Sequence, residues 1–312
     1  IMFLTGTFGI LIGGPLSLMI VTKVFPSAIP LSSEDLWRGL STVAGSWIGG
    51  GANQAAMKEM FEVNDEIFSS MITVDVIVAN IWMGFLLYGA GITKRLDNWL
   101  KADSSSIEEL KNQLIQFKKK NQRIPSFLDL MVICSIAFGI TGLSHLLADN
   151  IAPFIQQNYP GLSKFSLNSK FFWLIIFSTT GGLVLSFTKF RKYEGAGAST
   201  IGSIFLYILV ATIGMKMNAL AILDSPGVFL LGIIWMLVHV TLLLAVAKFI
   251  KAPFFFVAVG SQANVGGAAS APVVASAFHP SLAPVGVLLA VLGYALGTYA
   301  AWLCGILMQF AS

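Results

Sequence analysis

The chain has 312 residues, of which 56% are hydrophobic and only 11% are charged, and its mean hydropathy is +0.80. Soluble globular domains carry about 25% charged residues, so this composition excludes an ordinary soluble domain and indicates an integral membrane protein. The pI near 9.0 does not indicate a nucleic-acid-binding protein, because the basic residues cluster beside apolar runs, as in membrane topology. Cys134 and Cys304 lie inside apolar runs, which is not the pattern of a disulfide framework.

Apolar runs of about 20 residues can each cross a bilayer, and seven uninterrupted runs of this kind are predicted to be membrane spans. The first run begins at residue 1 without a basic leader, so it resembles a span already under way rather than a signal peptide. We therefore expect further sequence upstream. The predicted spans are residues 1–22, 66–92, 127–150, 171–188, 196–216, 227–248 and 283–310.

Two further segments, residues 35–61 and 252–278, contain the glycine-rich stretches GSWIGGGANQAA and GSQANVGGAASAP. Each glycine in a row such as 49–51 costs about 1 kcal/mol of helix propensity relative to alanine. Close helix packing explains scattered glycines, but it explains a run of glycines beside amides poorly. We therefore predict that each helix stops and restarts within the membrane, and that residues 49–53 and 260–266 are non-helical and lie close together.

The two interrupted segments have matched surroundings, because each lies between two uninterrupted spans. This repetition predicts an all-α polytopic membrane protein with a two-fold internal repeat and two discontinuous transmembrane helices. The repeat halves are expected at residues 1–100 and 127–312. A polar cytoplasmic linker, residues 101–126, joins them.

Matched helix breaks in two halves of a membrane protein are the best indication of a transporter site in a sequence. The freed backbone groups must be buried in protein or line a wet cavity. Half-helix N-termini suit an anionic group, while freed carbonyls and amides suit a cation or a polar solute. The predicted binding residues in the breaks are Ser46, Gly49, Gly50, Gly51, Asn53, Gln54, Ser261, Gln262, Asn264, Gly266 and Gly267. Na⁺ near Asn53 and Asn264 is considered as the coupling ion, and these amides are interpreted as ligands or as partners of freed backbone groups.

Asp75 is the only acidic residue deep inside a predicted span, and such residues usually face a cavity, a partner or an ion pathway. We consider Asp75 as a coupling-ion ligand or proton carrier, or as an acid satisfied by neighbouring helices. Asn80 on the same span joins the candidate binding site. His239 lies at the centre of its span and is interpreted as a proton relay or as a hydrogen-bonded structural residue. The sequence has no HExxH or CxxC spacing, so no metal site of that kind is predicted.

The Lys and Arg residues indicate the orientation of the chain. They concentrate in loops 94–123, 189–192 and 248–251, which the positive-inside rule places in the cytoplasm. We therefore expect the C-terminus and the 94–126 linker to face the cytoplasm. The expected location is a bacterial inner membrane.

Three stretches resemble the YjcL-like family (domain of unknown function 819), a bacterial membrane family of unknown function. They are GSWIGGGANQAAMKE, EGAGAS…LYILVATIGMK and GSQANVGGAASAPVV…HPSLAPVGVLLAVLGYALGTYAAWL. The resemblance covers essentially the whole chain and implies that upstream spans precede it. This family is grouped with the cation:proton antiporter and anion transporter superfamily, which includes bile-acid:sodium symporter-like proteins.

The resemblance implies two crossed discontinuous helices in a mobile core domain, a second domain that anchors the core, and transport by alternating access. It supplies no substrate. The repeats of that superfamily are inverted, whereas counting both interrupted segments as crossings makes them run in the same direction. Either a span is miscounted or one segment is re-entrant.

The leading hypothesis is therefore a secondary active transporter, elevator-like, for a small polar or anionic organic solute coupled to Na⁺ or H⁺. Its expected partners are the solute, the coupling ion and the lipid bilayer, without nucleic acid, and a homodimer is also considered. A monovalent cation/proton antiporter or a channel is the second hypothesis. A membrane enzyme is the third, and it needs a nucleophile in contact with a base among His239, Asp75, Ser261 and Ser270.

Overall fold

The computed structural model of the chain is α-helical, with no strand among the residues that it describes. These are residues 1–29, 31–103, 123–165, 167–168, 170–215, 226–279 and 282–312, with residues 105, 107, 109, 112, 113 and 116 of the linker. Much of the predicted linker 101–126, and Lys216, lie outside the described residues.

Helices occupy all the predicted uninterrupted spans. The two shorter ones are α8 (Lys170–Ser186) and α9 (Ala198–Gly214), each 17 residues long in the described part of the chain. In the described part of the chain, the short connecting helices are the 3₁₀-helices Pro26–Ala28, Pro160–Phe165 and Lys189–Ala196, and α5 (Thr93–Leu100). Among the described helices, those long and apolar enough to cross a membrane unaided are α1 (Met2–Val24), α4 (Asp65–Gly91), α7 (Phe127–Asn158), α11 (Pro226–Ile250) and α14 (Ala283–Ala311).

Both interrupted segments are broken helices, as predicted. α2 (Ser33–Gly49) and α3 (Gly51–Met60) are separated by Gly50, and α12 (Phe254–Val265) and α13 (Gly267–Phe278) by Gly266. Gly50 has φ 76° and ψ −178°, a conformation that only glycine adopts readily. The helices otherwise continue up to each break, so the prediction of non-helical backbone throughout residues 49–53 and 260–266 is wrong.

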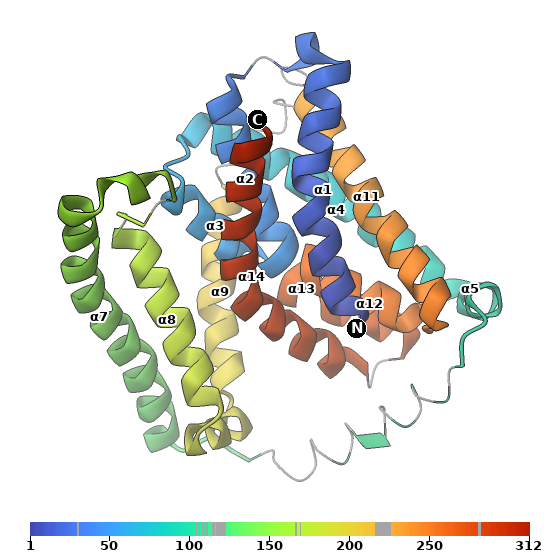
Figure 1. Cartoon of the computed structure of the whole chain (residues 1–312). Helices are drawn as coiled ribbons and strands as arrows, with labels where there is room; N and C mark the ends of the chain where they lie inside the picture. Colours follow the sequence, from blue (N-terminus) through green and yellow to red (C-terminus); the bar gives the residue numbers. More distant parts are fainter. Residues whose placement is uncertain are drawn as a thin grey trace.

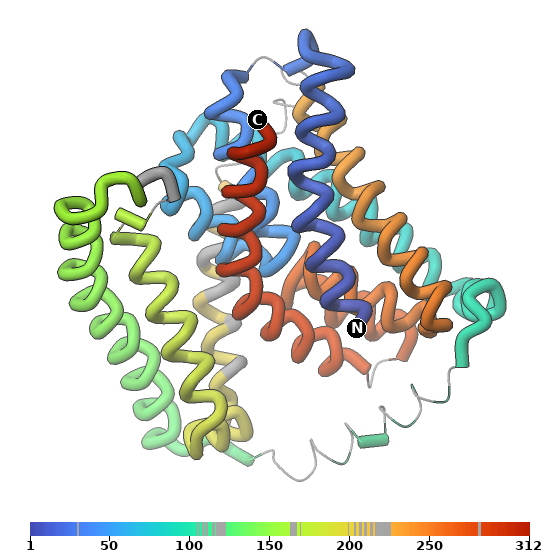
Figure 2. Tube along the Cα trace, in the orientation of Figure 1, coloured from blue at the N-terminus to red at the C-terminus, as the bar shows by residue number. Residues whose placement is uncertain are grey.

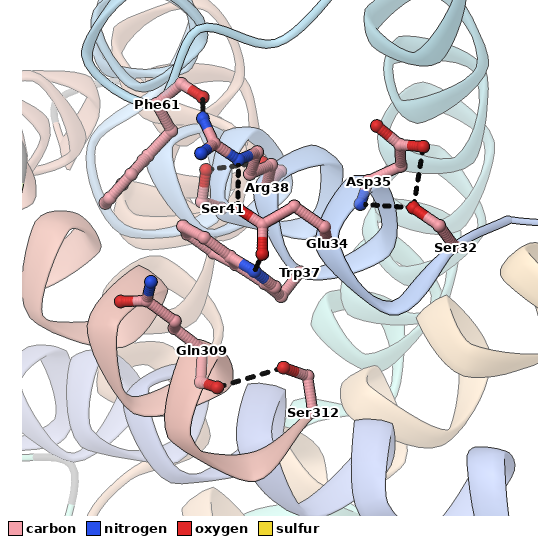
Figure 3. A network of polar contacts seen from close by, with 9 residues as sticks. All are labelled: Ser32, Glu34, Asp35, Trp37, Arg38, Ser41, Phe61, Gln309 and Ser312. Atoms are coloured by element: carbon pink, nitrogen blue, oxygen red, sulfur yellow. Dashed lines mark hydrogen bonds and ion pairs between the residues drawn. The ribbon is translucent and has the colours of Figure 1, made fainter. Parts of the chain in front are cut away.

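The first broken segment folds back on itself. Ring centroids of Trp37, near the start of α2, and Phe61, just after α3, are 5.3 Å apart. The Arg38 guanidinium also donates a hydrogen bond to the Phe61 carbonyl (Figure 3). In a continuous helix residues 37 and 61 would be about 36 Å apart, at 1.5 Å per residue. We call residues 33–60 hairpin 1.

The second broken segment has the same shape. Ring centroids of Phe255 at the start of α12 and Phe278 at the end of α13 lie 5.3 Å apart. Near the break, the Gln262 side chain donates a 2.6 Å hydrogen bond from Nε2 to the Ser270 hydroxyl. We call residues 254–278 hairpin 2. The two segments are thus paired hairpins rather than the crossed helices that the resemblance implies.

The two hairpins enter from opposite ends of the helix bundle. Gly227, at the start of α11, lies against Ala28, a few residues before hairpin 1, since a Cβ added to Gly227 would overlap the Ala28 carbonyl oxygen. Ala247, near the end of α11, belongs to a buried cluster with Phe254 at the base of hairpin 2. Because α11 is one continuous helix, the two bases lie at its opposite ends. The unit formed by α1, hairpin 1 and α4 is therefore inverted relative to the unit formed by α11, hairpin 2 and α14. Each hairpin enters and leaves at the same end of the bundle, so neither runs from one end to the other.

The C-terminus and the start of the linker also lie at opposite ends of the bundle (Figure 1). Gly305, near the end of α14, lies against the base of hairpin 1, since a Cβ added to it would be 2.7 Å from the Phe61 ring. Leu100 of α5 packs instead in the cluster with Phe254 at the base of hairpin 2. The prediction that both face the cytoplasm therefore fails for one of the two. It failed because it counted each interrupted segment as a crossing.

The helices form two groups in space. The trace in Figure 2 shows α7 and α8 side by side at one edge, while α1, α11, α14 and the two hairpins form the main body. α1 and α11 pack closely at Gly13, where an added Cβ would lie 2.6 Å from the Trp235 ring. The division of the chain into halves at residues 101–126 stays a prediction.

Candidate functional site

The tips of the two hairpins touch each other. A Cβ added to Gly267 would lie 3.4 Å from the Cα of Gly50. Tyr294 of α14 lies beside both glycines, and its hydroxyl accepts a 3.1 Å hydrogen bond from the backbone N–H of Ala268. The predicted proximity of the two breaks is therefore confirmed, with α14 packed against the junction.

A cavity of about 260 Å³ lies at this junction, between both hairpins and α4. The sequence-predicted site residues that line it are Ser46, Gly50, Gly51, Gln54, Asp75, Asn80, Gln262 and Gly266. The predicted residues that are not among its lining are Gly49, Asn53, Ser261, Asn264, Gly267 and His239. Elements far apart in the sequence thus converge on one cavity.

Part of the lining was missed by sequence reasoning. α4 presents Ile72, Val76 and Ala79 to the cavity beside Asp75, and α13 contributes Ala269 and Ser270. The positions on α4 are separated by three or four residues, which is the spacing of one helix face. That periodicity, started from Asp75, is the signal that could have found the residues of α4.

Asp75 is held by both arms of hairpin 1. Its Oδ1 accepts a 2.7 Å hydrogen bond from Trp47 Nε1 on α2, and its Oδ2 accepts a 3.0 Å hydrogen bond from Gln54 Nε2 on α3. The residue is 6% exposed, and no described Lys, Arg or His forms an ion pair with it. The carboxyl group is therefore buried beside the cavity with neutral donors only.

Gln262 contributes an unsatisfied acceptor to the same cavity. The residue is 2% exposed, and its Nε2 is used by the bond to Ser270. Its Oε1 is buried and has no hydrogen-bond partner among the described atoms. Buried polar atoms are nearly always paired, so this oxygen indicates a missing donor or cation.

Asn53 has protein partners for its whole side-chain amide. Its Nδ2 donates to the carbonyls of Gly49 and Tyr294, and its Oδ1 accepts from the Thr298 hydroxyl. Gly49 lies against α14 here, since a Cβ added to it would be 2.8 Å from the Gly293 carbonyl oxygen.

Asn264 repeats this pattern against α1. Its Nδ2 donates to the carbonyls of Gly260 and Phe3, and its Oδ1 accepts from the Thr7 hydroxyl. Each amide thus fastens a hairpin to a neighbouring long helix. Na⁺ near these amides stays a prediction, and the geometry favours a structural role.

We therefore expect Asn53→Ala and Asn264→Ala each to lower the free energy of unfolding by about 1–3 kcal/mol, because each leaves buried backbone and hydroxyl groups unpaired. Ligand affinity of the folded fraction should stay unchanged. The control is Asn150→Ala, since Asn150 is exposed and its side chain donates to the carbonyl of Leu146 on its own helix. Chemical unfolding and a binding titration on the same samples test this; a tenfold loss of affinity with normal stability would support ligation instead.

His239 and Ser261 contact each other behind the cavity wall. His239 Nε2 lies 2.8 Å from Ser261 Oγ, and Nδ1 lies 3.1 Å from the Gly6 carbonyl oxygen. A carbonyl can only accept, so Nδ1 carries the proton and Nε2 accepts from Ser261. Trp82 Nε1 also donates to Ser261 Oγ at 2.8 Å. The side-chain polar atoms of Trp82, Ser261 and His239 therefore all have partners within the protein. A proton-relay role for His239 stays a prediction.

The fold and the cavity define a polytopic α-helical membrane protein built on two inverted helical hairpins. The family model described as "Protein of unknown function (DUF819)" matches residues 1–310, and the chain belongs to this family. A relative is the "Uncharacterized membrane protein YjcL" of Bacillus subtilis (strain 168), which is 23% identical over 95% of this chain and 72% of the relative. No solved structure matches the chain.

Proposed function

We propose that the protein is a secondary active transporter that moves a small polar solute by alternating access. The observation that carries this proposal is the cavity of about 260 Å³ between the touching tips of two hairpins from opposite ends of the bundle. A site between two such tips is separated from each side by one hairpin. Movement of either hairpin would open it to that side alone.

The polar lining supports a binding function rather than a purely structural one. An acid with only neutral partners and an unpaired buried amide oxygen are costly in a membrane protein. Such groups persist most readily where a ligand completes them. Coupling to Na⁺ or H⁺ would provide the driving force, with Asp75 as the group that senses the ion.

The charged loops support an orientation for this transporter. The helices α4, α8 and α11, which precede the charged loops 94–123, 189–192 and 248–251, end at the same end of the bundle as the base of hairpin 2 (Figure 1). We assign this side to the cytoplasm. Hairpin 2 then faces the cytoplasm, and hairpin 1 and the C-terminus face the opposite side. α7 and α8, at the edge of the bundle, are the candidates for the static part of an elevator-like movement.

The proposal is tested by the accessibility of the cavity. In a chain with Cys134 and Cys304 replaced by alanine, Ser270→Cys should react with a membrane-impermeant thiol reagent added to either face of sealed vesicles. Planar bilayers should show no unitary ion currents. The matched control is Gly182→Cys, on a lipid-exposed surface of α8, which should react from neither face. Labelling of Ser270→Cys from one face only would contradict alternating access.

The second hypothesis, an antiporter or channel for small ions alone, predicts a narrow site around Asp75. The cavity instead extends over Asp75, Asn80, Gln262 and several aliphatic side chains. This width favours an organic solute.

One observation favours the third hypothesis, a membrane hydrolase. The hydrogen bond between Ser261 and His239 has the geometry of a nucleophile and its base. Both residues, however, are fully buried, and neither lines the cavity. A substrate in the cavity could not reach the Ser261 hydroxyl without rearrangement, so transport remains the better account.

A fluorophosphonate probe should therefore fail to label the folded protein. Ser261→Ala should lower the free energy of unfolding by about 1–3 kcal/mol, because it removes the partner of Trp82 and His239. Ser270→Ala, a serine that lines the cavity, is the control. Covalent labelling that disappears in Ser261→Ala but persists in Ser270→Ala would establish the hydrolase.

A further inference from the structure

The charge of the cavity indicates which solutes it can hold. Among its described lining residues Asp75 is the only ionisable one, and Lys, Arg and His are absent from that lining. A carboxylate in a site of low polarity is expensive unless a positive charge accompanies it. The protein supplies no such charge nearby in its described part, so a cationic ligand is favoured and an anionic one is repelled.

The hydrogen-bonding groups of the cavity point the same way. Gln262 Oε1 needs a donor. The Asp75 carboxyl group accepts only from neutral side chains among the described residues, those of Ser46, Trp47 and Gln54. An ammonium group carries three donors and no acceptor. It can therefore satisfy Asp75 and Gln262 together, which a carboxylate cannot.

The helix ends at the tips do not reverse this preference. At each tip one helix ends and the next begins, so partial charges of opposite sign lie close together and largely cancel. The backbone N–H of Ala268, at the start of α13, is already bonded to the Tyr294 hydroxyl. The anionic solute expected from half-helix N-termini therefore lacks support in the geometry of the tips.

The rest of the cavity wall is aliphatic. Ile72, Val76, Ala79, Val265 and Ala269 line it beside the polar groups. Its volume is about 260 Å³. This space is larger than a bare alkali ion fills, and its wall suits a short hydrocarbon chain.

We propose that the cavity binds a small organic cation, a protonated amine with a short aliphatic part, whose ammonium group pairs with Asp75 and donates to Gln262 Oε1. This inference rests on the proposed function, since the cation is then the transported solute. It replaces the anionic solute class by a cationic one.

Isothermal titration of the purified full chain tests the ligand class directly. Butylammonium chloride, sodium butyrate and sodium chloride are titrated separately at constant ionic strength. Butylammonium should bind with a Kd at least tenfold lower than that of butyrate, which has a similar chain and the opposite charge. Sodium chloride alone reports binding of Na⁺, one of the two proposed coupling ions, separately from binding of the amine.

Two variants assign the binding to this cavity. Asp75→Asn removes the charge, and Gln262→Leu removes the unpaired acceptor; each should weaken butylammonium binding at least tenfold. Asp149→Asn is the matched control, because this exposed acid pairs with Lys170 far from the cavity lining, and its affinity should be unchanged. Melting temperatures identify any variant that fails to fold. If Asp75→Asn fails to fold, the affinity of Gln262→Leu for butylammonium tests the inference.

Tighter binding of butyrate than of butylammonium, absence of binding by butylammonium, or butylammonium binding that is unaffected in the folded variants would each overturn the inference. These outcomes are separate from the accessibility test of transport. If the cavity opens to both faces but prefers butyrate, the transporter stands and the cation does not. If butylammonium binds but the cavity opens to one face only, the cationic ligand class stands and the alternating-access transporter does not.

Discussion

Gly50→Val is expected to lower the free energy of unfolding by about 2–6 kcal/mol. The backbone at Gly50 occupies a region that costs other residues about 1–3 kcal/mol. An added Cβ would also lie 3.0 Å from the Tyr294 ring, and such overpacking costs about 1–3 kcal/mol. Because hairpin 2 touches this tip, the variant should also lose ligand binding. Chemical unfolding in lipid-detergent micelles measures the change.

The matched control is Gly182→Ala in α8. A Cβ added there meets nothing within 4 Å, and the position is helical. The change should stabilise the protein slightly, by up to about 1 kcal/mol, through helix propensity. Equal stabilities of Gly50→Val and the wild type would show that the tip is not held in this backbone conformation.

Arg38→Met is expected to lower the free energy of unfolding by about 2–3 kcal/mol and to loosen the base of hairpin 1. The guanidinium donates to the Phe61 carbonyl at the end of α3 and lies 5.2 Å from the centre of the Trp37 ring (Figure 3). A hydrogen bond from a charged group contributes about 1.5–3 kcal/mol. The partly exposed ion pair with Glu34 adds little.

Arg95→Met provides the comparison, because Arg95 is an exposed arginine on α5. Exposed substitutions of this kind usually change stability by less than about 0.5 kcal/mol. Hydrogen exchange should rise at residues 58–61 in Arg38→Met and not in Arg95→Met. Unchanged exchange at the end of α3 in both variants would contradict a clamp at the base of hairpin 1.

The helices and their breaks could be predicted from the sequence because their signals are local. Long apolar runs specify spans, and Gly49, Gly50 and Gly51 in a row make a continuous helix unfavourable. The folding back of each segment could not be predicted in the same way. It depends on pairs such as Arg38 with Phe61 and Phe255 with Phe278, which are 23 residues apart.

The candidate site shows the same division between local and distant information. Asp75 could be identified as a candidate from the sequence, because it is an acidic residue in the middle of a long apolar run. The sequence could not show whether Asn53 and Asn264 face a cavity or a neighbouring helix, because their partners Thr298 and Thr7 lie more than 240 residues away. A usable signal was present in the Gly-Thr pairs at 6–7 and 297–298, one in each flanking helix.

The central claim is that two hairpins enter from opposite faces and meet over one site, and the most direct test is the sidedness of their ends. Single cysteines at Ser33 and Glu66 flank hairpin 1, and single cysteines at Lys251 and His279 flank hairpin 2. In sealed vesicles of one orientation, an impermeant thiol reagent should label the first pair from one face and the second pair from the opposite face. Labelling of the two ends of either hairpin from different faces would contradict the account.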